Sequence, residues 1–297
     1  MSSAGARTSA DEVLAKAAEI SGVDLRGAEA IRDGSHAIYR LADDVVARIG
    51  RLGSIDDARR ELRISQWLND SGIPTVEAET SLTQPVIVAG RPVTWWRLIP
   101  DHRPSTPGEL GSMLRALHAL SQPTEFELPA YDPFAGLRER IDTAGMLDQD
   151  DRTWLLQHYT RLRGQYGNLP NIISPCVIHG DAWQGNLVVP PSGIPTVLDL
   201  DKMSIGRREW DLTQLGVDYT DFSRVPLDDY RAFVVSYGGY DVTEWPGFRV
   251  LADIQELRWV AFAVAQSIGN GNAAAQAKHR IACLRGQVLR PWRWEAL

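Results

Sequence analysis

The pattern of apolar and polar positions divides the chain into two unlike halves. A helix is expected around Ala10 to Ile20. In the segment from Ala28 to Ile49, apolar and polar residues alternate in short stretches around a turn at Ala42-Asp43-Asp44, which predicts a β-hairpin. Asp56 to Asp70 then places its apolar residues at helical spacing among charged ones, which predicts a helix that ends before Pro74.

Two further strands complete the first half. They are predicted at Pro85 to Ala89 and at Val93 to Ile99, with Gly90-Arg91-Pro92 as the turn between them. The first hundred residues therefore give the order strand, strand, helix, strand, strand.

The second half is predicted to be mostly helical. A proline-rich connector, Pro100 to Pro107, leads into a helical pattern that is clearest at Glu109 to Leu120. The exception is Cys176 to Leu200, where two short apolar runs flank a predicted strand and turn. We expect a small sheet surrounded by helices there, and we predict two domains, 1–100 and 101–297.

Composition excludes several classes of protein. The formal net charge of -7 argues against a partner nucleic acid, because nucleic-acid-binding proteins present a basic surface to the phosphates. The longest apolar run, Trp259 to Ala265, is too short to span a bilayer, and the first ten residues lack the apolar stretch of a signal peptide. Cys176 and Cys283 have no zinc-ligand spacing and are expected to be reduced. We predict a cytoplasmic protein with no membrane partner.

The strongest chemical signal is the segment His179-Gly180-Asp181-Ala182-Trp183-Gln184-Gly185-Asn186, followed by Val197-Leu198-Asp199-Leu200-Asp201. Phosphoryl transfer needs one carboxylate to position the attacking hydroxyl, and oxygen ligands that bind Mg²⁺ beside the nucleotide phosphates. Asp181, Asn186 and Asp199 are residues of those types. The structural alternative, a plain turn at His179 to Asp181 and a capping role for Asp199, is the weaker interpretation because it leaves the whole spaced series to coincidence.

With these motifs, the sequence resembles the aminoglycoside phosphotransferase and choline kinase family, relatives of the protein kinases. The resemblance extends from about Ala28 to Arg258 and is specific in the two motif blocks. It implies an α+β, bilobal protein-kinase-like fold, with an N-terminal antiparallel sheet and one main helix, and a C-terminal lobe that is mostly helical.

The resemblance also implies roles for single residues. Asp181 corresponds to the catalytic Asp, and Asn186 and Asp199 correspond to the metal ligands. His179 would hydrogen-bond within the catalytic loop. Asp201 is expected to support the metal site without binding the metal, with a role as a partial metal ligand as the alternative. Asp211 is expected to support the catalytic loop from the following helix.

Nucleotide binding is assigned to the first half. The turn Asp33-Gly34-Ser35-His36 would lie over the phosphates, with Ser35 and His36 as the binding residues, although an ordinary hairpin turn is an equal alternative. The family's phosphate-binding lysine is replaced by Arg48, with Glu61 as its expected helix partner. The adenine is expected against the segment joining the lobes, at Trp96, Arg97 and Leu98, whose tryptophan could equally be a core residue.

The acceptor is expected to bind in the second half, facing Asp181. The candidate residues are Asp181, Trp183, Asp218, Glu256 and Trp259. Other acidic residues there, each as easily a solvated surface charge, are Asp221, Asp228, Asp229 and Asp253. The C-terminal tail around Trp292 and Trp294 is basic and aromatic, where an aminoglycoside site would be acidic.

We therefore predict an O-phosphotransferase, of antibiotic-resistance or metabolic type, that uses ATP or GTP with Mg²⁺ and acts on a hydroxyl of an aminoglycoside, amino sugar or similar small molecule. The alternative is a kinase-like protein that binds a nucleotide or small molecule with weak or no catalysis, which Arg48 in place of lysine suggests. Protein kinase activity is disfavoured because the D-F-G and A-P-E motifs are absent.

Overall fold

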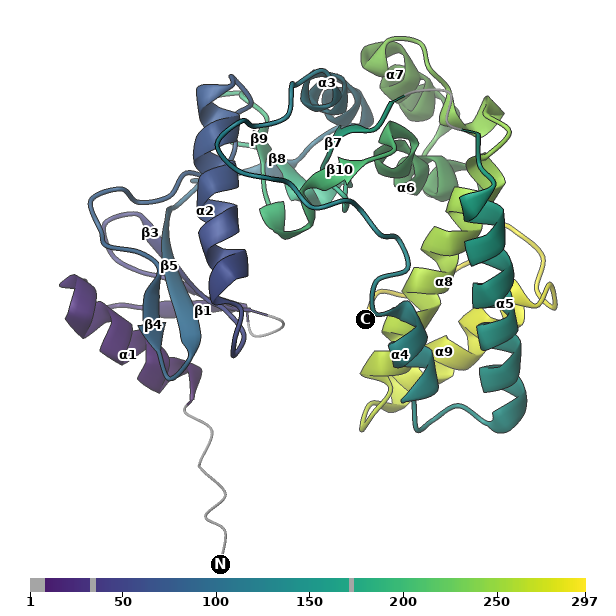
Figure 1. The fold of residues 1–297 in the computed structure, drawn as a ribbon, viewed down its shortest axis with the longest axis horizontal. Helices are drawn as coiled ribbons and strands as arrows, with labels where there is room; N and C mark the ends of the chain where they lie inside the picture. Colours follow the sequence, from purple (N-terminus) through teal and green to yellow (C-terminus); the bar gives the residue numbers. More distant parts are fainter. Residues whose placement is uncertain (1–8, 33–35, 171–173) are drawn as a thin grey trace, which may run out of the picture. The chain divides into compact units, whose positions relative to one another are not determined.

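The computed structural model describes residues 9–32, 36–170 and 174–297 (Figure 1). Its contacts divide the chain into two compact units. Unit 1 comprises Met1–Ser105 and Gly185–Asp201, and unit 2 comprises Thr106–Gln184 and Lys202–Leu297. The short segment 185–201 thus contacts the unit formed by the first third of the chain, while the domain boundary predicted at residue 100 stays a prediction.

Unit 1 contains a five-stranded antiparallel sheet with the strand order β1-β2-β3-β5-β4. Its strands are β1 (Glu29–Arg32), β2 (Ala37–Arg40), β3 (Val45–Ile49), β4 (Val86–Val88) and β5 (Arg91–Arg97). Its helices are α1 (Ala10–Ser21) and α2 (Ile55–Asp70). The predicted order of strand, strand, helix, strand, strand is confirmed, with α1 and β1 preceding it.

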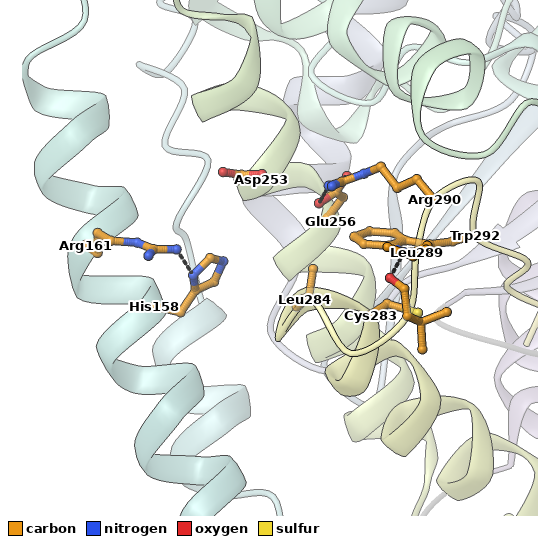
Figure 2. A pocket seen from close by; sticks show the side chains of 11 residues that line it. His158, Arg161, Asp253, Glu256, Cys283, Leu284, Leu289, Arg290 and Trp292 are labelled. Carbon is orange, nitrogen blue, oxygen red and sulfur yellow. Dashed lines mark hydrogen bonds and ion pairs between the residues drawn. The ribbon is translucent and has the colours of Figure 1, made fainter.

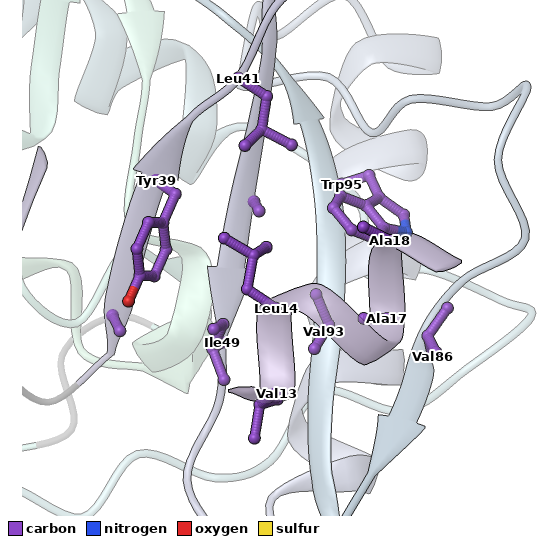
Figure 3. Packing of buried hydrophobic residues seen from close by; sticks show 12 residues of the cluster. Val13, Leu14, Ala17, Ala18, Tyr39, Leu41, Ile49, Val86, Val93 and Trp95 are labelled. Atoms are coloured by element: carbon purple, nitrogen blue, oxygen red, sulfur yellow. The ribbon is translucent and has the colours of Figure 1, made fainter. Parts of the chain in front are cut away.

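Helix α1 packs on one face of this sheet (Figure 3). It begins with a capping box, in which Ser9 and Glu12 each bond the other's backbone N–H. Its buried Val13 and Leu14 belong to one apolar cluster with residues of β2, β3, β4 and β5. Burying this stripe of the helix against the sheet stabilises unit 1 through the hydrophobic effect.

The alternation along β3 decides where its charged residue points. Ala47 and Ile49 are fully buried in the cluster that α1 covers. Because successive side chains of a strand lie on opposite faces of the sheet, Arg48 points to the other face, where it meets Glu61 of α2.

A second, three-stranded sheet belongs to unit 1 and has the order β6-β8-β9. Its strands are β6 (Arg103–Pro104), β8 (Leu187–Val189) and β9 (Thr196–Val197). Thr75, which follows α2, donates its hydroxyl proton to the carbonyl oxygen of Val197 at 2.7 Å. This buried bond fastens the late segment 185–201 to the first part of the chain.

Unit 2 is built around helix α8, which contacts α4, α5, α6 and α9. Helix α8 is apolar on most of its circumference, as expected for a buried helix. The helices are α3 (Pro107–His118), α4 (Leu137–Asp142), α5 (Gln149–Gly167), α6 (Arg208–Thr220), α7 (Leu227–Tyr237), α8 (Phe248–Gln266) and α9 (Gly271–Leu284). The strands of unit 2, β7 (Cys176–Ile178) and β10 (Ser204–Gly206), pair antiparallel. The structure also describes three short 3-10 helices, η1 (Gln184–Asn186), η2 (Leu200–Lys202) and η3 (Val242–Glu244). In the described part of the chain, no helix is both long and apolar enough to cross a bilayer.

Two local predictions were wrong, and a third, the helix after the proline-rich connector, is confirmed with shifted bounds. The turn between β4 and β5 is Ala89-Gly90, since Arg91 and Pro92 already pair with Val88 and Ile87. Helix α3 covers Pro107–His118 rather than residues 109–120, because a Thr106–Glu109 capping box starts it with Pro107 in the first turn. The expected single small sheet is two, because β7 pairs with β10 while β8 pairs with β6 and β9.

The corrected turn gives a test. Ala89 and Gly90 have φ angles of 49° and 75°, as in a type I′ turn, and an alanine there is strained. We expect Ala89→Gly to stabilise the protein by about 0.5–1 kcal/mol. The matched control is Ala116→Gly at an exposed position within α3, which should destabilise by about 1 kcal/mol. Thermal unfolding of both variants measures these changes, and a lower melting temperature for Ala89→Gly would contradict the turn.

Candidate active site

The loop that follows β7 is held by a single buried carboxylate of α6. Asp211, 1% exposed, accepts hydrogen bonds from the backbone N–H groups of His179 at 2.7 Å and Gly180 at 2.8 Å. Charge-assisted bonds of this kind are stronger than neutral ones and cannot be replaced by water in a buried place. Asp211 therefore fixes the backbone immediately before Asp181, which agrees with the supporting role expected for it.

A histidine of α3 completes the environment of Asp211. His118 places Nε2 3.0 Å from Asp211 and Nδ1 2.8 Å from the hydroxyl of Tyr237. Since the carboxylate can only accept, Nε2 carries a proton and donates it to Asp211. Three donors thus converge on one carboxylate, and a chain of hydrogen bonds links α3, α6 and α7.

Gly180 occupies a position that no other residue fits. Its φ is +81°, and a Cβ there would lie 2.5 Å from the carbonyl oxygen of Lys202. Its own carbonyl oxygen accepts from the Tyr131 hydroxyl at 3.0 Å and from Trp210 Nε1 at 3.1 Å. The backbone N–H and the carbonyl oxygen of Gly180 are therefore both hydrogen-bonded, which fixes the loop.

Asp181 lies at the exposed end of this loop. Its backbone N–H donates to Nδ1 of His179 at 3.3 Å, so His179 has the internal hydrogen-bonding role predicted for it. Nearby Trp183 is 47% exposed, which is unusual for so large an apolar side chain. An accessible carboxylate and an accessible aromatic ring thus follow a rigid, buried turn.

In unit 1, Arg48 connects several of the predicted nucleotide-binding residues. It forms an ion pair with Glu61, places Nη2 3.3 Å from Nδ1 of His36, and lies 3.7 Å from Oδ1 of Asp199. The arginine side chain is 16% exposed and that of Glu61 is 7% exposed. The structure therefore brings three sequence-predicted residues, Glu61, His36 and Asp199, to the guanidinium of Arg48. Ser35, predicted beside His36, lies outside the described residues.

Asn186 and Asp199 lie at the same end of the β8–β9 pair. Leu187 is opposite Val197 in the register, and one step further the N–H of Leu198 donates to the carbonyl oxygen of Asn186 at 2.9 Å. Asp199, the next residue, has φ 55°, a left-handed conformation that costs free energy for any residue with a Cβ. Such local strain is common at functional sites, where it fixes the direction of a side chain.

The donor set of Asn186 and Asp199 fits Mg²⁺. Both side chains offer oxygen atoms, and that of Asp199 is 43% exposed. Among the described residues, no group of three or more His, Cys, Asp or Glu side chains forms a closed metal cage. Mg²⁺ commonly takes one or two protein ligands and completes its shell with phosphate oxygens and water, so two oxygen ligands suit it.

Glu61 has an unusual protonation equilibrium. Burial raises the pKa of its carboxyl to about 7 against the lowering effect of Arg48, and the nearby carboxylates of Asp201 and Asp199 raise it further. The ion pair between Glu61 and Arg48 is therefore sensitive to pH near neutrality.

The segment predicted to contact adenine forms the end of β5 and the residue beyond it. Trp96 is buried and its Nε1 donates to Oγ1 of Thr94, which gives it a packing role. The N–H of Arg97 donates to the carbonyl oxygen of Glu77 at 2.8 Å, and that of Leu98 to the carbonyl oxygen of Asp44 at 2.6 Å. The backbone N–H groups of Arg97 and Leu98 are therefore already hydrogen-bonded within unit 1.

Most of the carboxylates considered for the acceptor site are paired with arginine. Asp218 binds Arg224 at 2.9 Å, and Glu256, 1% exposed, lies between Arg249 and Arg290. Trp259 packs edge-on against Phe222 and Trp294. Asp181 and Trp183 are exposed, as are Asp228 and Asp229, whereas Glu256 is buried and Asp218 and Trp259 are half-buried.

Sequence reasoning missed His118 and Tyr131, which help to hold the loop. His118 had a detectable signal, because it stands among the apolar residues of Leu114 to Leu120 at a helical spacing that predicts burial. Tyr131 lies in an irregular segment whose sequence carries no pattern, so only the structure reveals it.

The role of Asp211 predicts the effect of one substitution. In Asp211→Asn, the amide group places a donor among three donors, so the loop loses at least one bond. We expect a loss of roughly 2–4 kcal/mol in the free energy of unfolding and faster amide hydrogen exchange at His179 and Gly180. Asp229→Asn, at an exposed position of α7, is the control. Unchanged exchange in Asp211→Asn would contradict the role assigned to the carboxylate.

The raised pKa of Glu61 predicts a pH-dependent stability. Because the folded-state pKa lies above the unfolded value, the contribution of this carboxyl is complete below the unfolded pKa and is lost as pH rises through about 7. Glu61→Gln removes the titration. As pH rises from about 5 to about 7, the free energy of unfolding of the wild-type protein should therefore fall relative to that of Glu61→Gln, by roughly 1.4 kcal/mol for each pH unit. Chemical denaturation across this range measures it, and parallel pH profiles for the two proteins would disprove the shift.

Comparison with solved structures identifies the fold. An amicoumacin kinase, hAmiN, in complex with AMP-PNP, Ca²⁺ and Ami, is similar with a TM-score of 0.71 and 13% identity over 94% of each chain. A choline/ethanolamine kinase family protein from Mesorhizobium loti has a TM-score of 0.65 and 16% identity over 95% of each chain. At these identities the likeness establishes the fold alone, which is the protein-kinase-like fold expected from the sequence.

Sequence comparison extends this result. A probable ketoamine kinase from Lactiplantibacillus plantarum is 30% identical over 105 residues, which cover 34% of this chain and 36% of the relative. The match thus spans about a third of the curated relative's length. The family model described as "Phosphotransferase enzyme family" (APH) matches residues 27–251, which include both motif blocks and the residues around Arg48. The chain therefore belongs to the APH phosphotransferase enzyme family.

Proposed function

We propose that this phosphotransferase moves the γ-phosphoryl group of ATP, with Mg²⁺, to a hydroxyl of a small molecule, and that Asp181 positions that hydroxyl and accepts its proton. The observation that carries the proposal is the exposed carboxylate of Asp181 at the end of a loop whose backbone Asp211 holds from beneath. A general base must be accessible and held in a fixed direction, and this arrangement meets both conditions.

Asn186 and Asp199 are proposed to bind the metal through their side-chain oxygens. Bound Mg²⁺ would neutralise charge on the nucleotide phosphates. The left-handed backbone at Asp199 and the bond between Leu198 and Asn186 hold these two residues at one end of a strand pair. Asp201, whose charge acts on Glu61, is proposed to support this site without binding the metal.

Arg48 is proposed to bind the phosphates in place of the family's lysine. Its guanidinium has several donors in one plane, so it can keep Glu61 on one edge and offer another to an anion. Glu61 and His36 would hold the arginine in position. Since Leu98 already donates its N–H to Asp44, we propose that a purine base takes its backbone donor from Ile99, the next N–H before Pro100.

The acceptor is proposed to be a small polyol or amino sugar that carries fewer positive charges than an aminoglycoside. A polyamine needs unpaired carboxylates, but Asp218, Asp221, Asp253 and Glu256 are all bound by arginines. The exposed ring of Trp183 offers an apolar face beside Asp181 on which a sugar ring could stack. The relatives support a small acceptor, since their names describe kinases of a ketoamine and of amicoumacin.

The test is an acceptor screen with Mg-ATP that contains amino sugars, ketoamines, choline, nucleosides and aminoglycosides. Asp181→Asn should lower kcat by about 10²- to 10⁴-fold, the usual contribution of general acid–base catalysis. Mg-ATP should still raise the melting temperature of this variant, because the change leaves the proposed nucleotide site intact. The control is Asp56→Asn, a side chain that is 95% exposed at the start of α2.

Two results would contradict the proposal. Turnover that survives Asp181→Asn would remove Asp181 from its role. A wild-type protein that Mg-ATP and Mg-GTP fail to stabilise, and that turns over none of the acceptors, would favour the alternative of a kinase-like binding protein.

A further inference from the structure

Unit 2 contains a cavity of about 310 Å³, which is lined by α5, α8, α9 and the segment that follows α9 (Figure 2). Its walls include His158 and Arg161 from α5, Asp253 and Glu256 from α8, and the apolar Leu284 and Val288. A volume of this size is at the lower end of the range for small-molecule sites.

The cavity lies on the face of α8 that points away from the loop before Asp181. Arg258 stacks over Trp210, whose indole nitrogen binds the carbonyl oxygen of Gly180. Glu256 precedes Arg258 by two residues, and positions two apart on a helix point in nearly opposite directions. The cavity is therefore separate from the proposed catalytic residues.

His158 brings an unused hydrogen-bond donor to this cavity. Its side chain is 93% buried, since only 7% is exposed, and Nε2 has no hydrogen-bond partner among the residues that the structure describes. Nδ1 lies 2.6 Å from Nη2 of Arg161, and because a guanidinium can only donate, Nδ1 must accept. Burial, and secondly the charge of Arg161, lower the pKa of His158 to about 4. The ring is therefore neutral with its proton on Nε2, and Figure 2 shows this nitrogen turned from Arg161 toward the other walls.

An unpartnered donor in a buried position is costly, and a ligand oxygen would remove that cost. Trp154 stacks on the face of the imidazole at 4.9 Å, so the ring is held by Arg161 at one edge and by Trp154 at one face. The donor is consequently fixed in direction before any ligand arrives, as a binding site requires.

The charges around the cavity favour an anion. The acidic residues are already bound: Asp253 accepts from Arg249 at 2.7 Å, and Glu256 accepts from both Arg249 and Arg290. Burial raises the pKa of Glu256 well above its usual range, against the lowering effect of Arg249 and Arg290. Arg161, whose described hydrogen bond uses only one of its donors, places a positive charge next to His158.

The remaining wall is apolar. Leu284 and Val288 line it, and Leu289 at its edge is 86% exposed. Trp292 presents an edge to the cavity, because Arg290 covers one of its faces at 4.1 Å and Trp294 stacks on the ring at 5.3 Å. A ligand here would thus meet aliphatic side chains and would not stack on an aromatic ring.

We propose that this cavity is a binding site for a small aliphatic monocarboxylate, whose carboxylate accepts from Nε2–H of His158 and from Arg161 while its hydrocarbon body covers Leu284, Val288 and Leu289. One negative charge matches the guanidinium of Arg161 beside the His158 donor, and a planar carboxylate matches the fork of a guanidinium. The site goes beyond the phosphotransferase activity and does not depend on the roles proposed for that reaction.

The test uses hexanoate as the probe, with hexanamide and inorganic phosphate for comparison, on the full chain labelled with ¹⁵N at its six histidines. The imidazole resonance of His158 is assigned by its loss in His158→Gln. Hexanoate should shift this resonance saturably with a Kd in the range of roughly 1–10 mM, as expected for so small a ligand. Hexanamide should bind at least about tenfold more weakly, because it lacks the charge that Arg161 recognises.

Two variants on α5 test whether hexanoate binding depends on Arg161 itself. Arg161→Gln should weaken hexanoate binding by about tenfold or more. Arg163→Gln, on the same helix but bonded to the hydroxyl of Tyr159, should leave the affinity unchanged. The comparison of hexanoate with hexanamide on the wild-type protein needs no variant, so the proposal stays testable if a substitution unfolds the chain.

The proposal is overturned if hexanoate produces no saturable shift of the His158 resonance up to about 50 mM. Equal affinity for hexanamide would also overturn it, because the site would then recognise a neutral oxygen. Tighter binding of inorganic phosphate would assign the cavity to a different class of anion. An equal loss of hexanoate affinity in Arg161→Gln and Arg163→Gln would show that Arg161 makes no specific contact with the ligand.

Discussion

The bond between Asp211 and the two N–H groups of His179 and Gly180 is the constraint on which the rest of the proposed active site depends. A loop that must expose a carboxylate cannot use the hydrogen bonds of a sheet to hold its backbone, and yet its N–H groups need partners when they are buried. One buried carboxylate meets both needs. His118 bonds to that carboxylate and Tyr237 bonds to His118, so the position of the exposed Asp181 depends on a network of buried side chains.

The sequence predicted those features that depend on local patterns or on a spaced motif. Alternation placed Arg48 on a strand and helical periodicity placed Glu61 on the following helix, and the structure joins them in an ion pair. The pairing of β7 with β10, and of β8 with β6, could not be read in advance, because short apolar strands carry no information about their partners. His158 gave no signal for the same reason, since its environment is assembled from α5, α8 and the segment after α9.

Arginine decides the electrostatics of both units. Only three of the 31 basic residues are lysines, and the buried carboxylates of Glu61, Asp221 and Glu256 pair with guanidinium groups that contact two or three acceptors at once. Arg48 serves Glu61 and lies close to Asp199, and Arg249 serves Asp221, Asp253 and Glu256. Carboxylates with such partners are poor sites for a polyamine, which is why acidic composition in the second half was a weak guide to the acceptor.

The division of unit 1 between two stretches of sequence limits how this protein can be recombined with its relatives. Thr75 binds Val197, and β6 pairs with β8, so a fragment that ends near Ser105 lacks two of the three strands of its second sheet. A chimera made by one crossover near Ser105 would therefore combine residues 1–105 of one parent with residues 185–201 of the other. Under the roles proposed for Arg48, Asn186 and Asp199, nucleotide preference should transfer between relatives only when both segments are exchanged together.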